Sequence, residues 1–240
     1  MVSNGVWTFD SREQVYRVVA LEQFDWLDHW FGTRNSTLDF QGRNLATLHQ
    51  IHSDIAIAAD GQAGRIGDGD ALLTMTPGQL VAVRTADCLP ILIADERRHA
   101  VAAVHAGWRG TVLGVAAQAV RELGRLFASQ PEDLHAAIGP GIGACCYQVG
   151  PEVAAEFQPL FPERDLSGRT TIDLAEANRR RLAAAGLRDD RIYLGAPCTF
   201  CMKGEFFSYR REREQAGRML SGIGVRAANH SPSSLPKASG

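Results

Sequence analysis

Three short apolar runs that follow one another closely constrain the fold of this chain more than any other feature. They span residues 80–84 (LVAVR), 89–95 (LPILIAD) and 100–106 (AVAAVHA), and turn residues separate them. Apolar runs of this length with turns on either side are typical of buried strands. We therefore expect a central sheet built from these residues.

The flanking sequence predicts helices and further strands. Residues 110–128 carry apolar side chains at helical spacing, residues 151–161 begin with a proline, and residues 173–187 start at Asp173 and stop at Gly186. Pro, Asp and Gly at these places are ordinary helix start and stop signals. Further strands are expected at 14–20, 28–33, 45–51, 54–59, 134–140 and 191–197. The segment 61–71 is glycine-rich and is expected to be a loop.

Strands and helices alternate along the chain, without an internal repeat and without a linker before residue 230. This alternation predicts an α/β fold in one domain over residues 1–230. The last residues, 231–240 (SPSSLPKASG), are rich in Ser and Pro and are expected to form a disordered tail.

The composition excludes several classes of protein. Lys and Arg number 25 against 27 Asp and Glu, so no basic excess is available to neutralise a nucleic-acid backbone. No apolar run approaches the roughly 18 to 20 residues of a membrane helix. No signal peptide is visible, so we expect a cytoplasmic protein with reduced thiols.

Polar residues that packing does not explain gather in three blocks at strand ends. They are residues 50–54 (QIHSD), 85–90 (TADCLP) and 104–110 (VHAGWRG). Together they supply His52, Cys88 and His105, which are good ligands for a borderline-soft divalent metal. Three protein ligands with one open position would suit a catalytic zinc.

Other interpretations of these three residues need no metal. Cys88 in an apolar stretch is commonly a small buried hydrophobe, and His52 or His105 taken singly is commonly structural or exposed. Cys88 could also be a nucleophile with His105 as its base. The coincidence of three blocks is what favours a functional site.

Two further motifs leave their roles open. Cys198-x-x-Cys201 has no second such pair, and the adjacent Cys145 and Cys146 lack metal-ligand spacing, so packing is favoured for these cysteines. Residues 203–211 (KGEFFSYRR) could stack on a planar base and bind an anion, or could form an edge strand with solvated charges.

Taken together, these motifs resemble the YfiH (DUF152) family, also called the laccase-domain or multi-copper polyphenol oxidase family. The resemblance is carried by QIHSD, TADCLPILIAD, AVHAGWRGT, IGPGIGACCYQVG and CTFCMKGEFFSYRRE, and it covers about residues 28 to 225. It implies a layered α/β sandwich with mixed sheets, related to the catalytic domain of cytotoxic necrotizing factor. It also implies that His52, Cys88 and His105 bind zinc.

The resemblance implies a zinc-dependent purine nucleoside phosphorylase that also deaminates adenosine. Its substrates would be adenosine, inosine or methylthioadenosine together with phosphate. Asp87 is the candidate acid or base by adjacency to Cys88. Arg34, Arg109 and Arg210 are the candidate phosphate-binding residues; Arg34 is assigned to the catalytic set with Asp87, Cys88 and His105.

Three alternatives to this function remain. The first is a copper-dependent phenol oxidase, although one His/Cys/His site suits redox-inactive zinc better than copper chemistry. The second is a metal-free hydrolase that uses Cys88 and His105. The third is a non-catalytic binding module. We expect no nucleic-acid or membrane partner, and a monomer.

Overall fold

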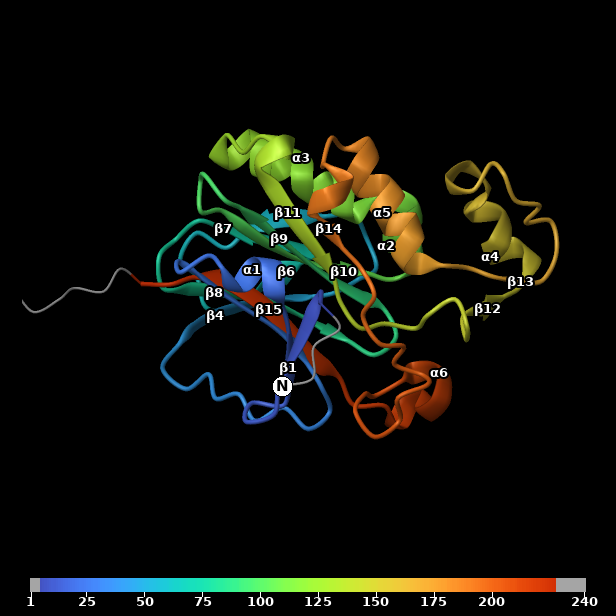
Figure 1. Cartoon of the computed structure of the whole chain (residues 1–240), viewed down its shortest axis with the longest axis horizontal. Coiled ribbons are helices and arrows are strands. Elements are labelled where there is room, and N and C mark those ends of the chain that lie inside the picture. Colours follow the sequence, from blue (N-terminus) through green and yellow to red (C-terminus); the bar gives the residue numbers. More distant parts are fainter. Residues whose placement is uncertain (1–4, 228–240) are drawn as a thin grey trace, which may run out of the picture.

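The computed structural model describes residues 5–227 and consists of two large sheets packed face to face (Figure 1). The first has seven strands in the order β1 (Trp7–Asp10), β2 (Val15–Val18), β3 (Leu27–Gly32), β15 (Met219–Val225), β8 (Gln79–Thr85), β4 (Asn44–His49) and β6 (Gly64–Asp68). The second has six, in the order β14 (Ile192–Tyr193), β11 (Leu134–Ile138), β9 (Leu89–Asp95), β10 (Val101–Ala106), β7 (Ala71–Thr74) and β5 (Ala56–Ala58). Both sheets mix parallel and antiparallel pairs.

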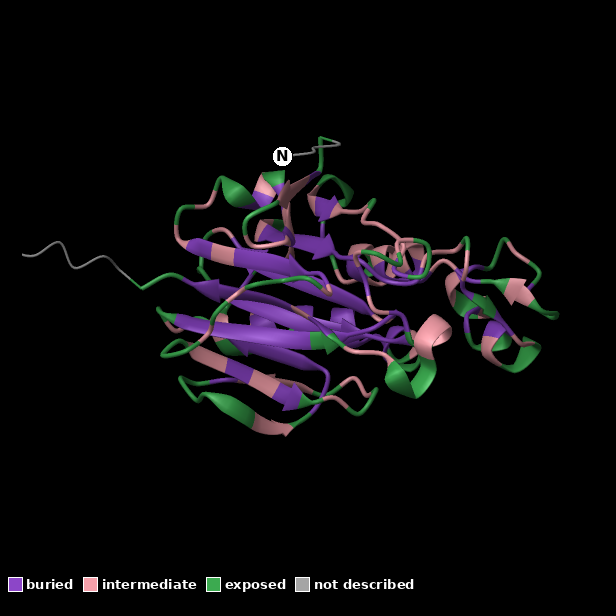
Figure 2. Cartoon of the chain, turned by 90° about the horizontal axis from the view of Figure 1, so that it is seen from below, coloured by how far each residue is buried: buried purple, intermediate pink, exposed green. Residues whose placement is uncertain are grey.

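The middle of the six-stranded sheet is buried on both faces, as the apolar runs predict. In β9, Leu92 and Ala94 face the seven-stranded sheet, whereas Ile91 and Ile93 face the helices. Because side chains alternate across a strand, a strand between two layers is apolar at every position. Figure 2 shows this buried centre with the exposed residues around it.

Helices cover the outer face of the six-stranded sheet. They are α2 (Trp108–Leu113), α3 (Val115–Phe127) and α5 (Leu174–Ala184). The expected single helix at 110–128 is in fact two helices, because Gly114 adopts a left-handed conformation with φ of 88°. The Asp173 side chain accepts a hydrogen bond from the Glu176 N–H at 2.9 Å and caps α5, as its sequence position predicts.

A small lobe stands beside the sandwich and joins β11 to α5 (Figure 1). It contains β12 (Gln148–Val149), α4 (Pro151–Glu156) and β13 (Thr170–Thr171). The remaining helical elements are α1 (Val19–Glu22), α6 (Tyr209–Glu212), η1 (Pro131–Asp133), η2 (Gln158–Leu160), η3 (Asp189–Arg191) and η4 (Arg213–Gln215). The expected helix at 151–161 is therefore shorter and ends in a 3₁₀ turn.

The predicted mixed α/β sandwich is confirmed, and its buried strands lie where the sequence places them. Several segments differ from expectation: strand β6 lies within 61–71, which was expected to be a loop, and strands β1, β7 and β15 were not foreseen. Strand β15 was missed because it contains Gly222, and glycine is uncommon inside strands. A Cβ at this position would lie 2.4 Å from Cζ2 of Trp30. The strand needs this glycine so that an indole can lie over it.

The expected tail at 231–240 lies outside the described residues, and the domain boundary at residue 230 stays a prediction. The relation to cytotoxic necrotizing factor likewise stays a prediction. Among residues 5–227, no helix has the length and apolar character that a membrane crossing requires.

Candidate active site

The register of two central strands brings Cys88 and His105 together. In the antiparallel pair β9 and β10, Ala106 lies opposite Leu89 and His105 lies opposite Pro90. The start of β9 and the end of β10 therefore meet at one edge of the sheet. Cys88 precedes β9 directly, so its thiol lies beside the His105 ring.

His52 reaches the same edge from the connection between β4 and β5, which belong to different sheets. Its backbone adopts a left-handed conformation with φ of 60°. The carboxylate of Asp70 holds this turn by accepting hydrogen bonds from the N–H groups of His52 at 3.1 Å and Ser53 at 2.6 Å. The turn is thus fixed by a buried charge.

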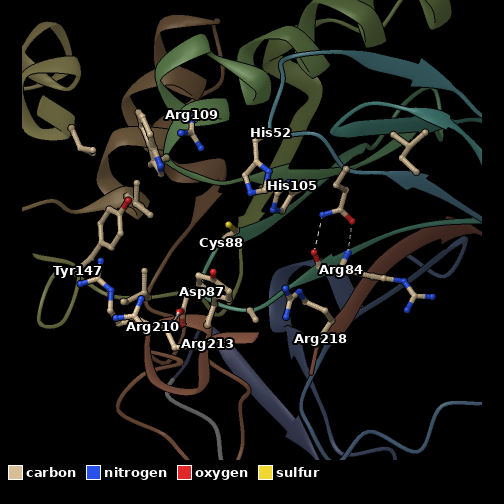
Figure 3. A pocket seen from close by; sticks show the side chains of 18 of the residues that line it. His52, Arg84, Asp87, Cys88, His105, Arg109, Tyr147, Arg210, Arg213 and Arg218 are labelled. Atoms are coloured by element: carbon tan, nitrogen blue, oxygen red, sulfur yellow. Dashed lines mark hydrogen bonds between the residues drawn. The ribbon is translucent and has the colours of Figure 1, made fainter. Parts of the chain in front are cut away.

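The donor atoms of His52, Cys88 and His105 all lie within 4.8 Å of one another (Figure 3). His52 is exposed, whereas His105 is buried, so the cluster opens to solvent on one side. Gly107 makes room for it, because a Cβ there would lie 3.0 Å from both Cys88 Sγ and His52 Cδ2. A glycine is therefore required at position 107 of the AVHAGWRGT motif, because the side chains of Cys88 and His52 approach its Cα closely.

Asp70 also orients the His105 ring. Its Oδ1 lies 2.7 Å from His105 Nδ1, and its backbone carbonyl accepts the His105 N–H at 2.7 Å. A carboxylate on Nδ1 fixes the ring so that Nε2 points away from it, as behind many metal-binding histidines. The sequence reasoning missed Asp70; its only signal was an acidic residue directly before an apolar strand.

The cluster favours a thiolate. Burial raises the pKa of the Cys88 thiol, but hydrogen bonds with His105 and His52 outweigh burial and lower it to about 6. Burial lowers the pKa of His105, yet its bonds to Asp70 and Cys88 raise it to about 9. Thiolate is the form that binds metals and the form that attacks electrophiles.

A cleft of about 1250 Å³ opens in front of the cluster, large enough for a nucleoside and an anion. Guanidinium groups dominate the charge of its lining: Arg65, Arg84, Arg109, Arg210, Arg213 and Arg218. Within residues 5–227, none of these six is ion-paired with a carboxylate. Figure 3 shows five of them around the cleft. Unpaired arginines in a concave site attract anions.

Three aromatic side chains complete the lining. Tyr147 comes from the loop after β11, Trp108 starts α2, and Tyr209 starts α6. Arg210 lies over the Tyr147 ring with 5.5 Å from Cζ to the centroid, and Arg109 lies 4.5 Å over Trp108. The cleft therefore combines flat apolar faces with cationic groups.

Asp87 lines the cleft, but its carboxylate is fully engaged. Oδ1 accepts from Thr199 Oγ1 at 2.7 Å, and Oδ2 accepts from Ser208 Oγ at 3.0 Å and from the Arg210 N–H at 2.7 Å. A carboxylate with three such donors holds a loop in place. Its geometry favours a positioning role over proton transfer.

The structure brings Arg109 and Arg210 to the cleft but leaves Arg34 outside the described lining. The Arg34 guanidinium lies 4.6 Å over the Phe207 ring, donates to the Lys203 carbonyl at 2.9 Å and is 3.6 Å from Glu212. Arg65, Arg84, Arg213 and Arg218 had no distinctive sequence signal: Arg65 lies in the glycine-rich segment, Arg84 lies within strand β8, and Arg213 and Arg218 follow the 203–211 motif.

The 203–211 segment is not an edge strand, so that alternative is wrong. Phe206 is buried, and Tyr209 and Arg210 form part of α6 and line the cleft. The packing interpretation also fails for part of the remaining cysteines, because Cys145 and Cys201 are exposed.

Known proteins resemble this chain over most of its described length. Residues 33–226 match the family model described as multi-copper polyphenol oxidoreductase laccase. A Deinococcus radiodurans protein named purine nucleoside phosphorylase is 42% identical over 195 residues, which are 79% of this chain and 74% of that protein. A protein of an unknown prokaryotic organism named adenosine deaminase RL5 is 38% identical over 175 residues, 70% of this chain and 66% of that protein.

Solved structures show the same architecture. YlmD from Geobacillus stearothermophilus superposes with a TM-score of 0.83 at 28% identity, over 92% of this chain and 99% of that chain. The hypothetical protein YfiH of Bacillus licheniformis gives a TM-score of 0.82, also at 28% identity, over 93% and 100%. The predicted resemblance and the prediction of an enzyme are both confirmed, and the chain belongs to the multi-copper polyphenol oxidoreductase laccase family that includes the YfiH and YlmD proteins.

Proposed function

We propose that this protein is a zinc-dependent purine nucleoside phosphorylase that also deaminates adenosine. One observation carries the proposal: the His52, Cys88 and His105 donor atoms converge within 4.8 Å at a cleft whose six arginines have no carboxylate partner among residues 5–227. The names of the relatives from Deinococcus radiodurans and of adenosine deaminase RL5 supply the substrate class.

The donor set fits zinc. Two imidazoles and one thiolate suit a borderline-soft cation, and Asp70 leaves His105 Nε2 free to coordinate. His52 faces the cleft, so the open side of the site is where a substrate would enter. A zinc ion bound there would supply a Lewis acid and lower the pKa of a bound water towards neutrality.

The cleft residues would bind and orient the two substrates. Arg210, Arg213 and Arg218 would hold phosphate, and the flat faces of Trp108 and Tyr147 would flank the purine. In phosphorolysis a phosphate oxygen bonds to C1′ of the ribose as the bond from C1′ to N9 breaks. The electron pair goes to the base, which takes up a proton. In deamination a water oxygen adds to C6 and the amino group leaves as ammonia.

Asp87 would act on this chemistry through the loop that it holds. Its bonds to Thr199, Ser208 and the Arg210 N–H place Arg210 at the cleft. We therefore assign Asp87 a positioning role. Arg34, with its guanidinium over Phe207, would support the same loop from outside the cleft.

Product analysis tests the proposal. Adenosine and inosine are incubated with the protein, with and without phosphate, and the products are identified. We expect free base only with phosphate, and inosine from adenosine without it; the Cys88→Ser variant should form neither. Conversion of neither nucleoside would contradict the proposal and favour a binding module. Oxygen consumption with a phenol that depends on added copper would favour the oxidase.

A second candidate is a metal-free hydrolase, because Asp70, His105 and Cys88 also line up as orienter, base and nucleophile. His52 separates the two candidates. It is a ligand in the zinc site but has no role in such a triad. Activity of His52→Ala close to wild type, with no metal bound, would favour the hydrolase; loss of activity together with zinc supports our proposal.

A further inference from the structure

Four cysteines that are far apart in the sequence meet at one place outside the active site. Their Sγ atoms all lie within 4.8 Å of one another. We call these residues the four-cysteine cluster: Cys145, Cys146, Cys198 and Cys201. Two come from the loop after β11, and two from the segment between β14 and α6. All four are free thiols.

The spacing of these sulfur atoms fits a tetrahedral metal site. Cys201 Sγ lies 3.7 Å from Cys145 Sγ and 3.4 Å from Cys146 Sγ. Zinc–sulfur bonds of about 2.3 Å at tetrahedral angles place the sulfur atoms about 3.8 Å apart. A disulfide would need about 2.05 Å instead. Four sulfurs at this spacing leave room for one ion between them.

Backbone groups around the cluster favour a thiolate at Cys198 and let the two segments approach closely. The Gly143 N–H donates to Cys198 Sγ at 3.2 Å, a bond that stabilises negative charge on sulfur. A Cβ on Gly143 would lie 3.3 Å from Cys145 Sγ, so the glycine lets the loop approach closely. Arg211, whose guanidinium is ion-paired with Glu212 at 2.7 Å, donates to the carbonyl groups of Thr199 and Phe200 and so holds the turn between Cys198 and Cys201 in place.

We propose that the four-cysteine cluster is a second, structural zinc site, closed by four thiolates. Binding would release the four thiol protons, and no position would remain for a substrate. The site is independent of the proposed function, because it shares no ligand with the His52, Cys88 and His105 cluster.

The position of the cluster indicates what the metal would hold together. Gly141 and Cys198 form an isolated bridge, and the Thr199 N–H donates to the Gly141 carbonyl at 2.9 Å. Tyr147 lies just after the first cysteine pair, and Arg210 follows the second; its guanidinium donates to the Gln148 carbonyl at 3.0 Å. The first segment lines the cleft through Tyr147, and the second leads into α6, whose Tyr209 and Arg210 line it. Both segments contain little regular structure. A metal crosslink would fix this wall of the cleft.

Zinc counting with paired variants tests the site. The purified full chain should hold two zinc ions, the Cys198→Ser/Cys201→Ser variant one, and the matched Cys88→Ser variant one. If the active-site proposal alone is wrong, wild type should hold one ion, which Cys88→Ser keeps and Cys198→Ser/Cys201→Ser loses. An unchanged zinc content in Cys198→Ser/Cys201→Ser would overturn the second site.

A measurement on the wild-type chain avoids any folding defect of the variants. The native protein is treated with iodoacetamide before and after chelation, and modified peptides are located by mass spectrometry. We expect Cys145 and Cys201 to be protected before chelation, although both are exposed, and to react after it. Immediate alkylation with zinc present, or a disulfide among the four, would overturn the proposal.

Discussion

The two cysteine-containing clusters of this protein use similar ligands but are built on different supports. His105 belongs to β10, and Cys88 directly precedes β9, so the register of a buried strand pair sets their separation. The four-cysteine cluster lies instead on two irregular segments, and two of its members are exposed.

This difference separates the roles that a metal could have. At the active site the sheet and Asp70 fix the ligands in advance, so a bound ion can keep an open position for chemistry. At the four-cysteine cluster the ligands lie on segments without a shared sheet, joined by contacts such as the bond from the Thr199 N–H to the Gly141 carbonyl, so an ion there would supply order. The same ligand type can thus serve a preformed site or create one.

The sharpest test of the preformed site is Asp70→Asn, which removes the charge behind His105 and changes little in size. We expect zinc affinity and nucleoside turnover to fall about 10- to 100-fold, the usual cost of losing such a partner. Metal titration and steady-state kinetics measure this. Asp68→Asn is the control, because Asp68 is exposed and contacts only His49 in the described hydrogen bonds. Equal zinc affinity and equal turnover in the two variants would show that Asp70 does not support the site.

How far the sequence could predict this site depended on what its residues do. His52, Cys88 and His105 were found because reactive residue types at strand ends are conspicuous. Asp70 was missed, although it organises the site, because one aspartate before a strand has no distinctive pattern. Its importance arises from pairing between β7 and β10, which brings Ala71 opposite Val104 and so Asp70 beside His105.

The fold shows the same limit. The apolar runs predicted β8, β9 and β10, whereas β15 was missed because its glycines resemble a loop signal. It pairs between β3 and β8, and its Gly222 lies against the Trp30 ring, a contact that only tertiary packing reveals. The four-cysteine cluster was discounted for a related reason: local spacing does not show that Cys145 and Cys201 are neighbours.

Acid would protonate the ligands of any metal bound at either cluster, so the acid limit of their common scaffold must be known. His29 sets a limit: burial and the nearby Arg17 lower its pKa to about 3, and its Nε2 accepts the Val18 N–H at 2.9 Å. In the unfolded chain the pKa of His29 is about 6.5. The free energy of unfolding is therefore highest above pH 6.5 and decreases as the pH falls towards 3, because the unfolded chain takes up the proton first. We expect a loss of about 2 kcal/mol between pH 7 and 5 from this residue.

Chemical unfolding of His29→Gln at both pH values measures this loss. Gln keeps an acceptor for the Val18 N–H but cannot take up a proton, so its stability should vary less over this range. His49→Gln, at an exposed position, should keep the acid sensitivity of wild type. If His29→Gln lost as much stability as wild type, another group would set the limit.

The cationic lining offers a test on the same wall of the cleft. Arg210→Ala should raise the KM for phosphate on the order of tenfold, because a charged hydrogen-bond donor is lost. Arg34→Ala is the matched control. The Arg34 guanidinium lies over Phe207, which belongs to the same 203–211 segment as Arg210, but Arg34 does not line the cleft. Kinetics at varied phosphate measure both. A larger effect at Arg34 would contradict the assignment of phosphate to Arg210 and favour Arg34, the other candidate from the sequence.

The smallest expected effect concerns the four-cysteine cluster and what it holds. Cys198→Ser/Cys201→Ser should raise the KM for nucleoside about threefold and leave kcat nearly unchanged, because a looser wall weakens binding by ~0.6 kcal/mol. Hydrogen exchange should increase in residues 141–150 and 198–210 and stay unchanged in β9 and β10. A fall in kcat with unchanged exchange in those two segments would contradict this role, because it would place the effect on the reacting groups. If protection from hydrogen exchange is lost only in the cleft wall, the chain uses one cysteine cluster for chemistry and the other for order.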